Sequence, residues 1–392
     1  MLCQESTCFF YNILVYYTGS ALIVYTIAKS VITATSTAIE YLKNGEKNHM
    51  KITELNTQMN PEISRNITLL RYPAIVMVVM IHNVFEYAPL PVFCKYFERF
   101  FSYSFPQIGV PIFFAASGYL LFHKAEFENT SYSELIKRRI QSLVIPYIFW
   151  NAAVLAFYLT GPLLPVLGKF FLSGKLNDYQ WYDYFLRSFG ITEYYPIAFQ
   201  FWFIRNLVIF VLLYPIFLWL MRRIKWQILV LGAVAMLFLP KYPFEGLSYF
   251  LLGGILAVNK LTLESTRKYL PLLALFFVAG VALYTAFLWP MRISLLCGVL
   301  MCYHLASWCA DHEKIKQTLF MLAPSSIFVF AAHGLFSGTL RRVLQKIFMP
   351  QSSLSLIFFY FLSLVITLAV MTALYFVLKK TVPKILKFTC GR

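Results

Sequence analysis

Long apolar runs separated by short basic segments are the feature that most constrains how this chain can fold. From residue 69 to 380, apolar runs of about 15–25 residues recur, each broken by charged residues or by Pro and Gly. An α-helix needs a run of this length to cross the hydrocarbon core of a bilayer. The pattern therefore predicts an all-α polytopic membrane protein with about ten spanning helices. We expect them at residues 69–89, 105–122, 143–164, 203–221, 226–240, 245–259, 270–289, 293–309, 319–340 and 354–378.

The composition excludes a water-soluble globule and several other classes of protein. Hydrophobic residues make up 59% of the 392 residues and charged residues only 13%, whereas soluble domains are roughly a quarter charged. The net charge of +17 does not indicate nucleic-acid binding, because the Lys and Arg residues lie between apolar spans and form no basic arm or nucleic-acid motif. The sequence has no P-loop and no GxGxxG, and its 7 cysteines lack CxxC spacing. We therefore expect no nucleotide-driven pump, dinucleotide enzyme or metal site.

The basic residues predict the orientation of the helices. Most basic clusters fall in alternate connections, which the positive-inside rule places in the cytoplasm together with the start of the first core helix. These clusters are Lys124 with Lys137–Arg139, Arg222–Lys225, Lys260 with Arg267 and Lys268, Lys314 with Lys316, and the tail from Lys379 to Lys387. Arg341, Arg342 and Lys346 fall on the opposite side, as an exception to the rule. The predicted location is the inner (plasma) membrane.

The N-terminal region is a separate question. Residues 1–64 are interpreted as an extension and residues 65–392 as the main transmembrane domain. Residues 9–31 are apolar enough for an eleventh helix, although they are rich in Thr, Ser and Tyr, and Met50 resembles an ordinary start. An additional helix and an over-extended start therefore both remain open, and a cleaved signal peptide is less favoured.

The connection at about 165–201 is predicted to lie on the outer side of the membrane. It carries six aromatic residues: Tyr179, Trp181, Tyr182, Tyr184, Tyr194 and Tyr195. Rings of this kind suit the headgroup region of a bilayer, which is the favoured interpretation. They also suit stacking on sugar rings.

An arginine and a histidine eleven residues apart lie in the first predicted span. Eleven positions turn a helix three times plus about 20°, so Arg71 and His82 share one face, about 16 Å apart along the axis. Ionisable residues at membrane depth are costly and should face the protein interior or a wet cavity. Histidine also exchanges a proton near neutral pH, which suits a general base. Taken alone, Arg71 could be a snorkelling anchor and His82 a hydrogen-bonding residue between helices.

These two residues and the segments that follow resemble the acyltransferase family 3 membrane enzymes. The hallmark of that family is an Arg followed by ten residues and a His, which Arg71 and His82 match. Residues 109–121, GVPIFFAASGYLL, are similar to the family's second core helix, and residues 137–150 resemble its basic loop and third helix. Weaker similarities lie at Phe201-Trp202-Phe203, at residues 249–253, and at residues 327–329 with His333.

The resemblance implies an O-acyltransferase of the bacterial cell envelope. Such an enzyme moves an acetyl or other short acyl group from cytoplasmic acyl-CoA, expected to be acetyl-CoA, to a hydroxyl of an extracytoplasmic polysaccharide or glycolipid. Lipopolysaccharide, capsule and exopolysaccharide are candidate acceptors, and no metal is expected. It implies Arg71 and His82 as the catalytic pair. Many relatives carry two Arg residues three apart that grip the phosphates of the donor. Here the second is missing, so Arg138 and Arg139 are expected to share that task, unless they are only positive-inside charge.

Three further residues are candidates with competing interpretations. Ser117 could carry the acyl group covalently, but a small residue beside Gly118 more often serves helix packing. His333 is either a second titrating group or a hydrogen-bonded helix residue, and Trp202 belongs to the weaker similarities. The rival function is a multi-helix transporter or flippase for a lipid-linked sugar. It explains the helices and the buried His and Arg, but not their spacing, and the sequence shows no inverted repeat.

Overall fold

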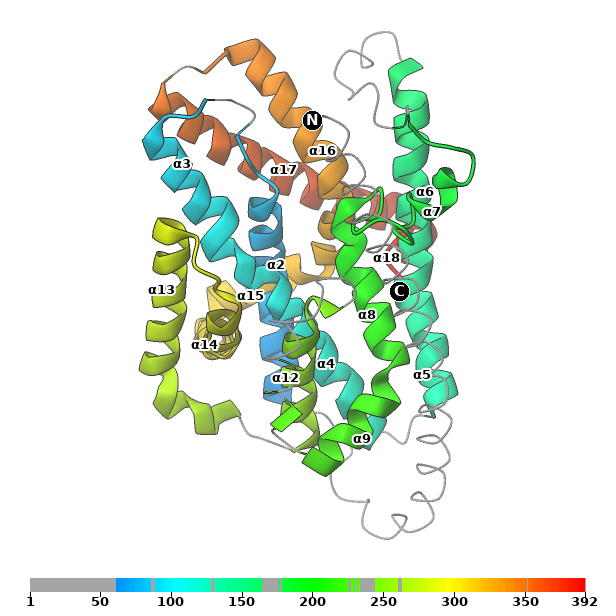
Figure 1. Ribbon diagram of the computed structural model, residues 1–392, viewed down its shortest axis with the longest axis vertical. Coiled ribbons are helices and arrows are strands. Elements are labelled where there is room, and N and C mark those ends of the chain that lie inside the picture. Colours follow the sequence, from blue (N-terminus) through cyan, green and yellow to red (C-terminus); the bar gives the residue numbers. More distant parts are fainter. Residues whose placement is uncertain are drawn as a thin grey trace, which may run out of the picture.

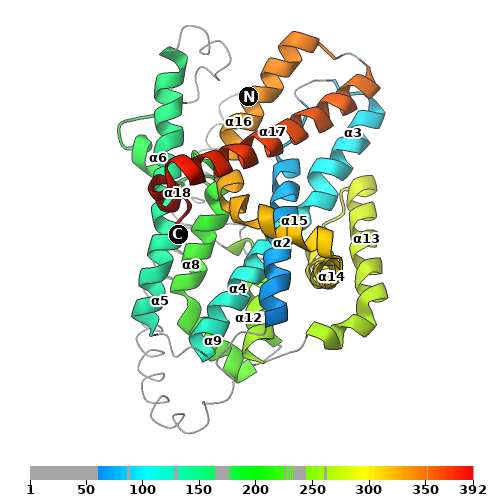
Figure 2. The same cartoon turned by 180° about the vertical axis from the view of Figure 1, so that it is seen from behind.

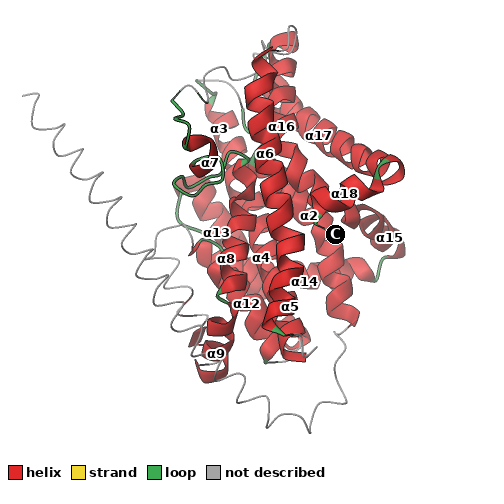
Figure 3. Ribbon diagram, turned by 90° about the vertical axis from the view of Figure 1, so that its right-hand side faces the viewer, coloured by secondary structure: helices red, strands yellow, loops and turns green. Residues whose placement is uncertain are grey.

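A bundle of helices makes up the part of the chain that the structure describes. This computed structural model describes residues 61–391 except 86–88, 128–130, 164–175, 177, 225–226, 229, 231, 233–243, 260–262 and 351. Figure 1 shows α2 and α4 inside the bundle, with α13 at one edge and the column of α5 and α6 at the other. Seen from behind in Figure 2, α17 crosses the bundle and leads to α18 beside α6. The described elements are all helical (Figure 3), which confirms the predicted fold class for these residues.

The helices have the following bounds. They are α2 (Pro61–Ile81), α3 (Val92–Glu98), α4 (Gly109–Phe127), α5 (Tyr132–Arg139), α6 (Ile145–Thr160), α7 (Asp183–Leu186), α8 (Trp202–Leu212), α9 (Tyr214–Ile224), α12 (Leu247–Val258), α13 (Leu270–Phe287), α14 (Arg292–Ala310), α15 (Glu313–Leu322), α16 (Ser326–Phe348), α17 (Ser353–Thr381) and α18 (Pro383–Cys390). Short π-helical or 3₁₀ turns are η1 (Arg99–Ser104), η2 (Phe105–Ile108), η3 (Ile140–Val144), η4 (Gly161–Leu163), η6 (Phe199–Phe201), η7 (Leu263–Tyr269) and η8 (Ala323–Ser325).

The described ranges contain fewer spanning helices than the ten expected. Seven helical segments are long and apolar enough to cross a membrane, and the bent pair Phe199–Leu212 and Tyr214–Ile224 brings the number to eight. The pair is bent by 65° next to Pro215, which has no N–H to continue the helical hydrogen bonds. The predicted span 245–259 is α12, which has only 12 residues. Most of the predicted span 226–240, and all of residues 9–31, lie outside the described residues.

The first core helix lies earlier in the chain than the predicted 69–89. Helix α2 begins at Pro61, where proline and the acidic Glu62 suit a helix N-terminus. It ends at Ile81 in a tight turn, because the N–H groups of His82 and Asn83 bond carbonyls three residues back, at 3.2 and 3.0 Å. His82 therefore follows the last helical residue instead of lying within the span.

The backbones of α4 and α12 approach each other very closely. A Cβ atom added to Gly118 would overlap the carbonyl oxygen of Phe250, and one added to Gly253 would overlap that of Ala115. Only glycine allows this contact, as in many pairs of membrane helices. Phe114, Phe122 and Phe250 are fully buried in the surrounding core.

Helix α2 is the central element that positions the site. It packs against α4, α14, α15 and α16, and buried side chains such as Ile75 and Val79 fill these contacts. Its His82 end meets α16 and the segment around η6. Residues from three distant parts of the sequence therefore meet at one end of one helix.

Candidate functional site

The ring of His82 lies between two other rings at the end of α2. Its centroid is 4.6 Å from that of Phe199 in an edge-to-face arrangement, and 5.5 Å from that of His333 in a stacked one, with 25° between the planes. Phe199 comes from η6 and His333 from α16. The structure thus brings together two of the histidines singled out from the sequence, although 250 positions separate them.

The hydrogen bonds of His333 fix its tautomer. Its side chain is 0% exposed, and Nδ1 lies 2.8 Å from the carbonyl oxygen of Phe330 and 3.1 Å from that of Val329. Carbonyl oxygens only accept, so Nδ1 carries the hydrogen and donates it. Nε2 therefore presents a lone pair, and it is buried without a hydrogen-bond partner among the described residues. A buried acceptor of this kind calls for a donor.

The segment that follows His82 is tied to three other elements. Asn83 Nδ2 donates to the carbonyl of Tyr360 at 2.8 Å, and the Ser363 hydroxyl donates to Asn83 Oδ1 at 2.9 Å. The Ser102 hydroxyl donates to the Asn83 carbonyl at 2.8 Å, and the backbone N–H of Phe85 donates to a carboxylate oxygen of Glu98 at 2.7 Å. These bonds hold the turn that carries His82 in place without a helix around it.

Arg341 contacts the same turn from α16. Its Nη1 donates to the carbonyl oxygen of His82 at 2.8 Å. The sequence singled out Arg341 only as an exception to the charge rule, not as part of a site. The signal in the sequence was its departure from the predicted charge pattern.

Phe199 is held by two neighbours that the sequence analysis missed. The backbone N–H of Ala198 donates to Asn151 Oδ1 at 3.1 Å. The buried Gln200 donates from Nε2 to the carbonyl of Ala331 at 2.8 Å, and its side chain packs against Gly334 of α16. Nothing in the spacing of Asn151 or Gln200 indicates these contacts, which depend on how α6 and α16 pack.

The expected arginines lie away from the two histidines. Arg71 is partly buried on α2, eleven residues and about 16 Å along the axis from His82. Arg138 is exposed and pairs with Glu134 on its own helix at 2.6 Å, and Arg139 beside it is partly buried. Both lie on α5, at the lower right of Figure 1. The structure does not bring Arg138 or Arg139 to His82.

Ser117 lies towards the opposite end of α2 from His82. An apolar pocket of about 490 Å³ is lined by Ile63 and Ile67 of α2 and by Ala116 and Tyr119 of α4, among others. Ser117 is therefore level with the first turns of α2. From Ile67 to the end of α2 at Ile81 the helix rises by about 21 Å.

Trp202 packs against α4. Its ring centroid is 6.1 Å from that of the buried Phe114, at the margin of the α4–α12 core.

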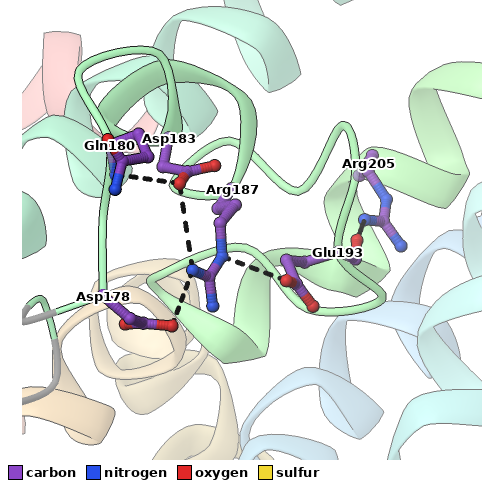
Figure 4. Close-up of polar contacts among 6 residues, drawn as sticks. All are labelled: Asp178, Gln180, Asp183, Arg187, Glu193 and Arg205. Carbon is purple, nitrogen blue, oxygen red and sulfur yellow. Dashed lines mark hydrogen bonds and ion pairs between the residues drawn. The ribbon is translucent and has the colours of Figure 1, made fainter. Parts of the chain in front are cut away.

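The described part of the 165–201 loop is rigidly built, as Figure 4 shows. Arg187 bonds Asp178 at 2.9 Å and Glu193 at 3.0 Å, and lies 4.0 Å from Asp183. The hydrogen bond from Arg187 holds the pKa of Asp178 below its usual range. Arg205 of α8 donates to the carbonyl oxygens of Gly190, Glu193 and Tyr194 at 2.7, 3.2 and 2.8 Å. This loop leads directly into η6 and so into Phe199.

The aromatic residues of that loop divide into two groups. Tyr179 lies under the Arg187 guanidinium, and the Tyr194 hydroxyl donates to the carboxylate of Glu245. Burial raises the pKa of Glu245 to about 7, against a smaller opposite effect of Arg292. Trp181 is 85% exposed, and Tyr182 and Tyr195 are also exposed. The three exposed rings are available to lipid or sugar. The sequence alone did not distinguish them from Tyr179 and Tyr194, which have partners within the protein.

The described residues contain no group of three His, Cys, Asp or Glu side chains that could hold a metal ion.

Comparison with known proteins identifies the domain. A family model described as an acyltransferase domain, Acyl_transf_3, matches residues 64–376. This match confirms the resemblance found in the sequence. No solved structure matches the chain.

One curated relative is the succinoglycan biosynthesis protein ExoH of Rhizobium meliloti (strain 1021). It is 29% identical over 196 residues, which cover 46% of this chain and 50% of the relative. The chain thus spans about half the length of this relative.

Proposed function

The chain belongs to the Acyl_transf_3 family of acyltransferase domains, and from this premise we propose that it transfers an acetyl or other short acyl group to a glycan hydroxyl. The donor is a cytoplasmic acyl-CoA, with acetyl-CoA the first candidate. The acceptor is an extracytoplasmic polysaccharide or glycolipid. The relative named for succinoglycan biosynthesis supports a polysaccharide acceptor.

The observation that carries the proposal is the contact between His82 and His333. His82 acts as the general base: it takes the proton of the acceptor hydroxyl while the oxygen attacks the thioester carbonyl. The new C–O ester bond forms, the C–S bond breaks, and the CoA thiolate leaves and receives the proton from His82. His333 presents a fixed lone pair on Nε2 next to the His82 ring. No hydrogen bond joins these two described rings in the stacked arrangement. A rotation of the His82 ring that aims its N–H at this lone pair lets His333 accept the hydrogen bond, and the other nitrogen of His82 is then the base that faces the hydroxyl.

The donor enters from the Pro61 end of α2 in this proposal. Arg138 and Arg139 lie on α5 at that end of the bundle, and a guanidinium suits the phosphates of CoA. Arg71 stands between that end and His82, along the path of the thioester. The Pro61 end then faces the cytoplasm of a cell with an inner membrane, and the His82 end faces outward.

The position of Ser117 favours direct transfer over a serine-bound intermediate. Its level on α4, about 22 Å along α2 from His82, places it away from the proposed base. Gly118 beside it serves the close contact with α12, which supports the packing interpretation of this segment. The rival transporter or flippase is less supported, because the matched family is one of acyltransferases.

A transfer assay with the purified protein tests the proposal. The protein in detergent or nanodiscs is mixed with labelled acetyl-CoA and surface glycan, and free CoA and the acyl label on the glycan are measured. His82→Ala should lose at least about 100-fold in rate, the contribution typical of a general base. His312→Ala, which removes an exposed histidine, is the matched control and should retain activity. An active His82→Ala variant would refute the mechanism, and a wild-type protein that neither releases CoA nor labels glycan would favour the transporter.

A further inference from the structure

A pocket adjoins the turn that carries His82. It is open to the outside and has a volume of about 390 Å³, between the residues after α2, the second half of α16 and the first half of α17. Its lining includes Asn83, Phe85, Arg341, Gln345 and Tyr360. Aromatic rings with a few fixed polar groups are the usual lining of a small-molecule site.

The walls of this pocket are fixed before any ligand arrives. Asn83 is 1% exposed and bonds both Tyr360 and Ser363 of α17. The Tyr360 hydroxyl donates to the carbonyl of Phe101 at 2.9 Å. Side chains locked in this way present a ligand with one geometry, and they cost little ordering on binding.

Arg341 supplies a charge at this pocket. Its guanidinium is anchored to the carbonyl oxygen of His82 at 2.8 Å, so the cation stands at the end of the helix that carries the proposed base. Arg341 also belongs to the group with Arg342 and Lys346 that violates the positive-inside pattern. A guanidinium matches carboxylate and phosphate groups, so Arg341 gives this pocket the chemistry of an anion site.

We propose that this pocket is an acceptor subsite that binds an anionic group of the glycan through Arg341. The proposal rests on the acyltransferase function above and names its substrate class: an acceptor with a carboxylate or phosphate next to the sugar that is acylated. The pocket is lined by the residues that directly follow His82, so an anionic group bound there holds the neighbouring sugar at the turn that carries the imidazole. Carboxylate and phosphate share the chemistry that Arg341 recognises, and the experiment distinguishes them.

The test compares three preparations of the surface glycan from cells that lack this protein: untreated, reduced at its carboxyl groups, and dephosphorylated. Transfer by the wild-type protein should show a KM at least about 10-fold higher on one treated glycan, and that treatment identifies the anion. Arg341→Gln should raise KM on the untreated glycan to the same level, with little change in kcat and no further loss on the treated glycan. Arg341→Lys should lie between the two.

Two controls separate recognition from folding. Lys346→Gln removes an exposed cation of the same helix that does not line the pocket, and should behave as the wild type. In the unmutated protein, a free sugar with the anion identified above, glucuronate for a carboxylate or glucose 6-phosphate for a phosphate, should compete with the acceptor and free glucose should not.

Equal KM values on all three glycans in the wild type would overturn the subsite alone. So would an Arg341→Gln variant that loses kcat equally on treated and untreated glycans, since Arg341 would then only support the His82 turn. A wild-type protein that acylates no glycan would refute the proposed function and the subsite with it.

Discussion

Substituting His333 tests whether its Nε2 lone pair assists His82. Nδ1 is committed to the carbonyls of Phe330 and Val329, while Nε2 has no partner among the described residues. His333→Gln can place its side-chain oxygen near the position of Nε2 and so retain an acceptor. His333→Asn is too short to do so, and His333→Ala removes both nitrogens.

The expected loss in kcat follows from the hydrogen bond that His333 would accept from His82. If His333 accepts a hydrogen bond from His82 as it gains a proton, that bond involves a charged partner and contributes about 1.5–3 kcal/mol. This corresponds to a loss of roughly 10- to 150-fold in kcat for His333→Asn and His333→Ala. The loss should be smaller than for His82→Ala, because the base itself remains. His333→Gln should stay within about 10-fold of the wild type.

The assay is the rate of transfer from labelled acetyl-CoA at saturating acceptor, followed from pH 5 to pH 9. His304→Gln is the matched control, since His304 is also buried but bonds Thr266 at 2.9 Å, on other elements. In the weakened variants the pH at which activity is half-maximal should move, while His304→Gln should leave it in place. The role assigned to His333 would be wrong if His333→Asn were as active as His333→Gln, or if all three variants lost expression and activity in proportion without any change in the pH profile.

Two further predictions concern stability. Gly253→Ala should lower the thermal unfolding midpoint in detergent, at a cost of about 1–3 kcal/mol, because the new Cβ would lie 2.7 Å from the backbone nitrogen of Tyr119 and overlap the Ala115 carbonyl. Gly338→Ala, where the nearest atom is 4.0 Å away, should be neutral or stabilising, and the opposite order would contradict the α4–α12 contact. Because burial raises the pKa of Glu245 from 4.5 to about 7, its contribution is complete below pH 4.5 and is lost as the pH rises through 7. Glu245→Gln should therefore flatten the decline of the unfolding midpoint between pH 5 and pH 8, and an unchanged slope would refute this.

Several of the helices could be predicted from the sequence, because a local property, the length and hydropathy of an apolar run, specifies them. Apolar runs at 270–289, 293–309 and 354–378 became α13, α14 and α17 with small shifts, since their length and hydropathy suffice to specify a helix. The start of α2 was misplaced by eight residues. Its first turns, from Pro61 to Thr68, carry polar residues that a hydropathy pattern excludes, yet they are helical.

The sequence predicted the residues of the site better than it predicted the contacts between them. The eleven-residue spacing indicated Arg71 and His82, but the ends of helices depend on local hydrogen bonds such as that from His82 N–H to Val79. The stacking of His333 on His82 joins residues whose sequence separation gives no period to detect. Arg341 was visible only as an exception to the predicted charge pattern, because its bond to the His82 carbonyl exists only once α16 packs against α2.

The short helix α12 has a consequence for how the protein is made. Twelve residues of helix are about 18 Å long, well short of the roughly 30 Å of a bilayer core. The contacts of Gly253 with the backbone of α4 and of Gly118 with the backbone of α12 give this short helix a partner along its length. Because α4 precedes α12 in the chain, we expect α12 to settle in the membrane by docking on a helix that is already there.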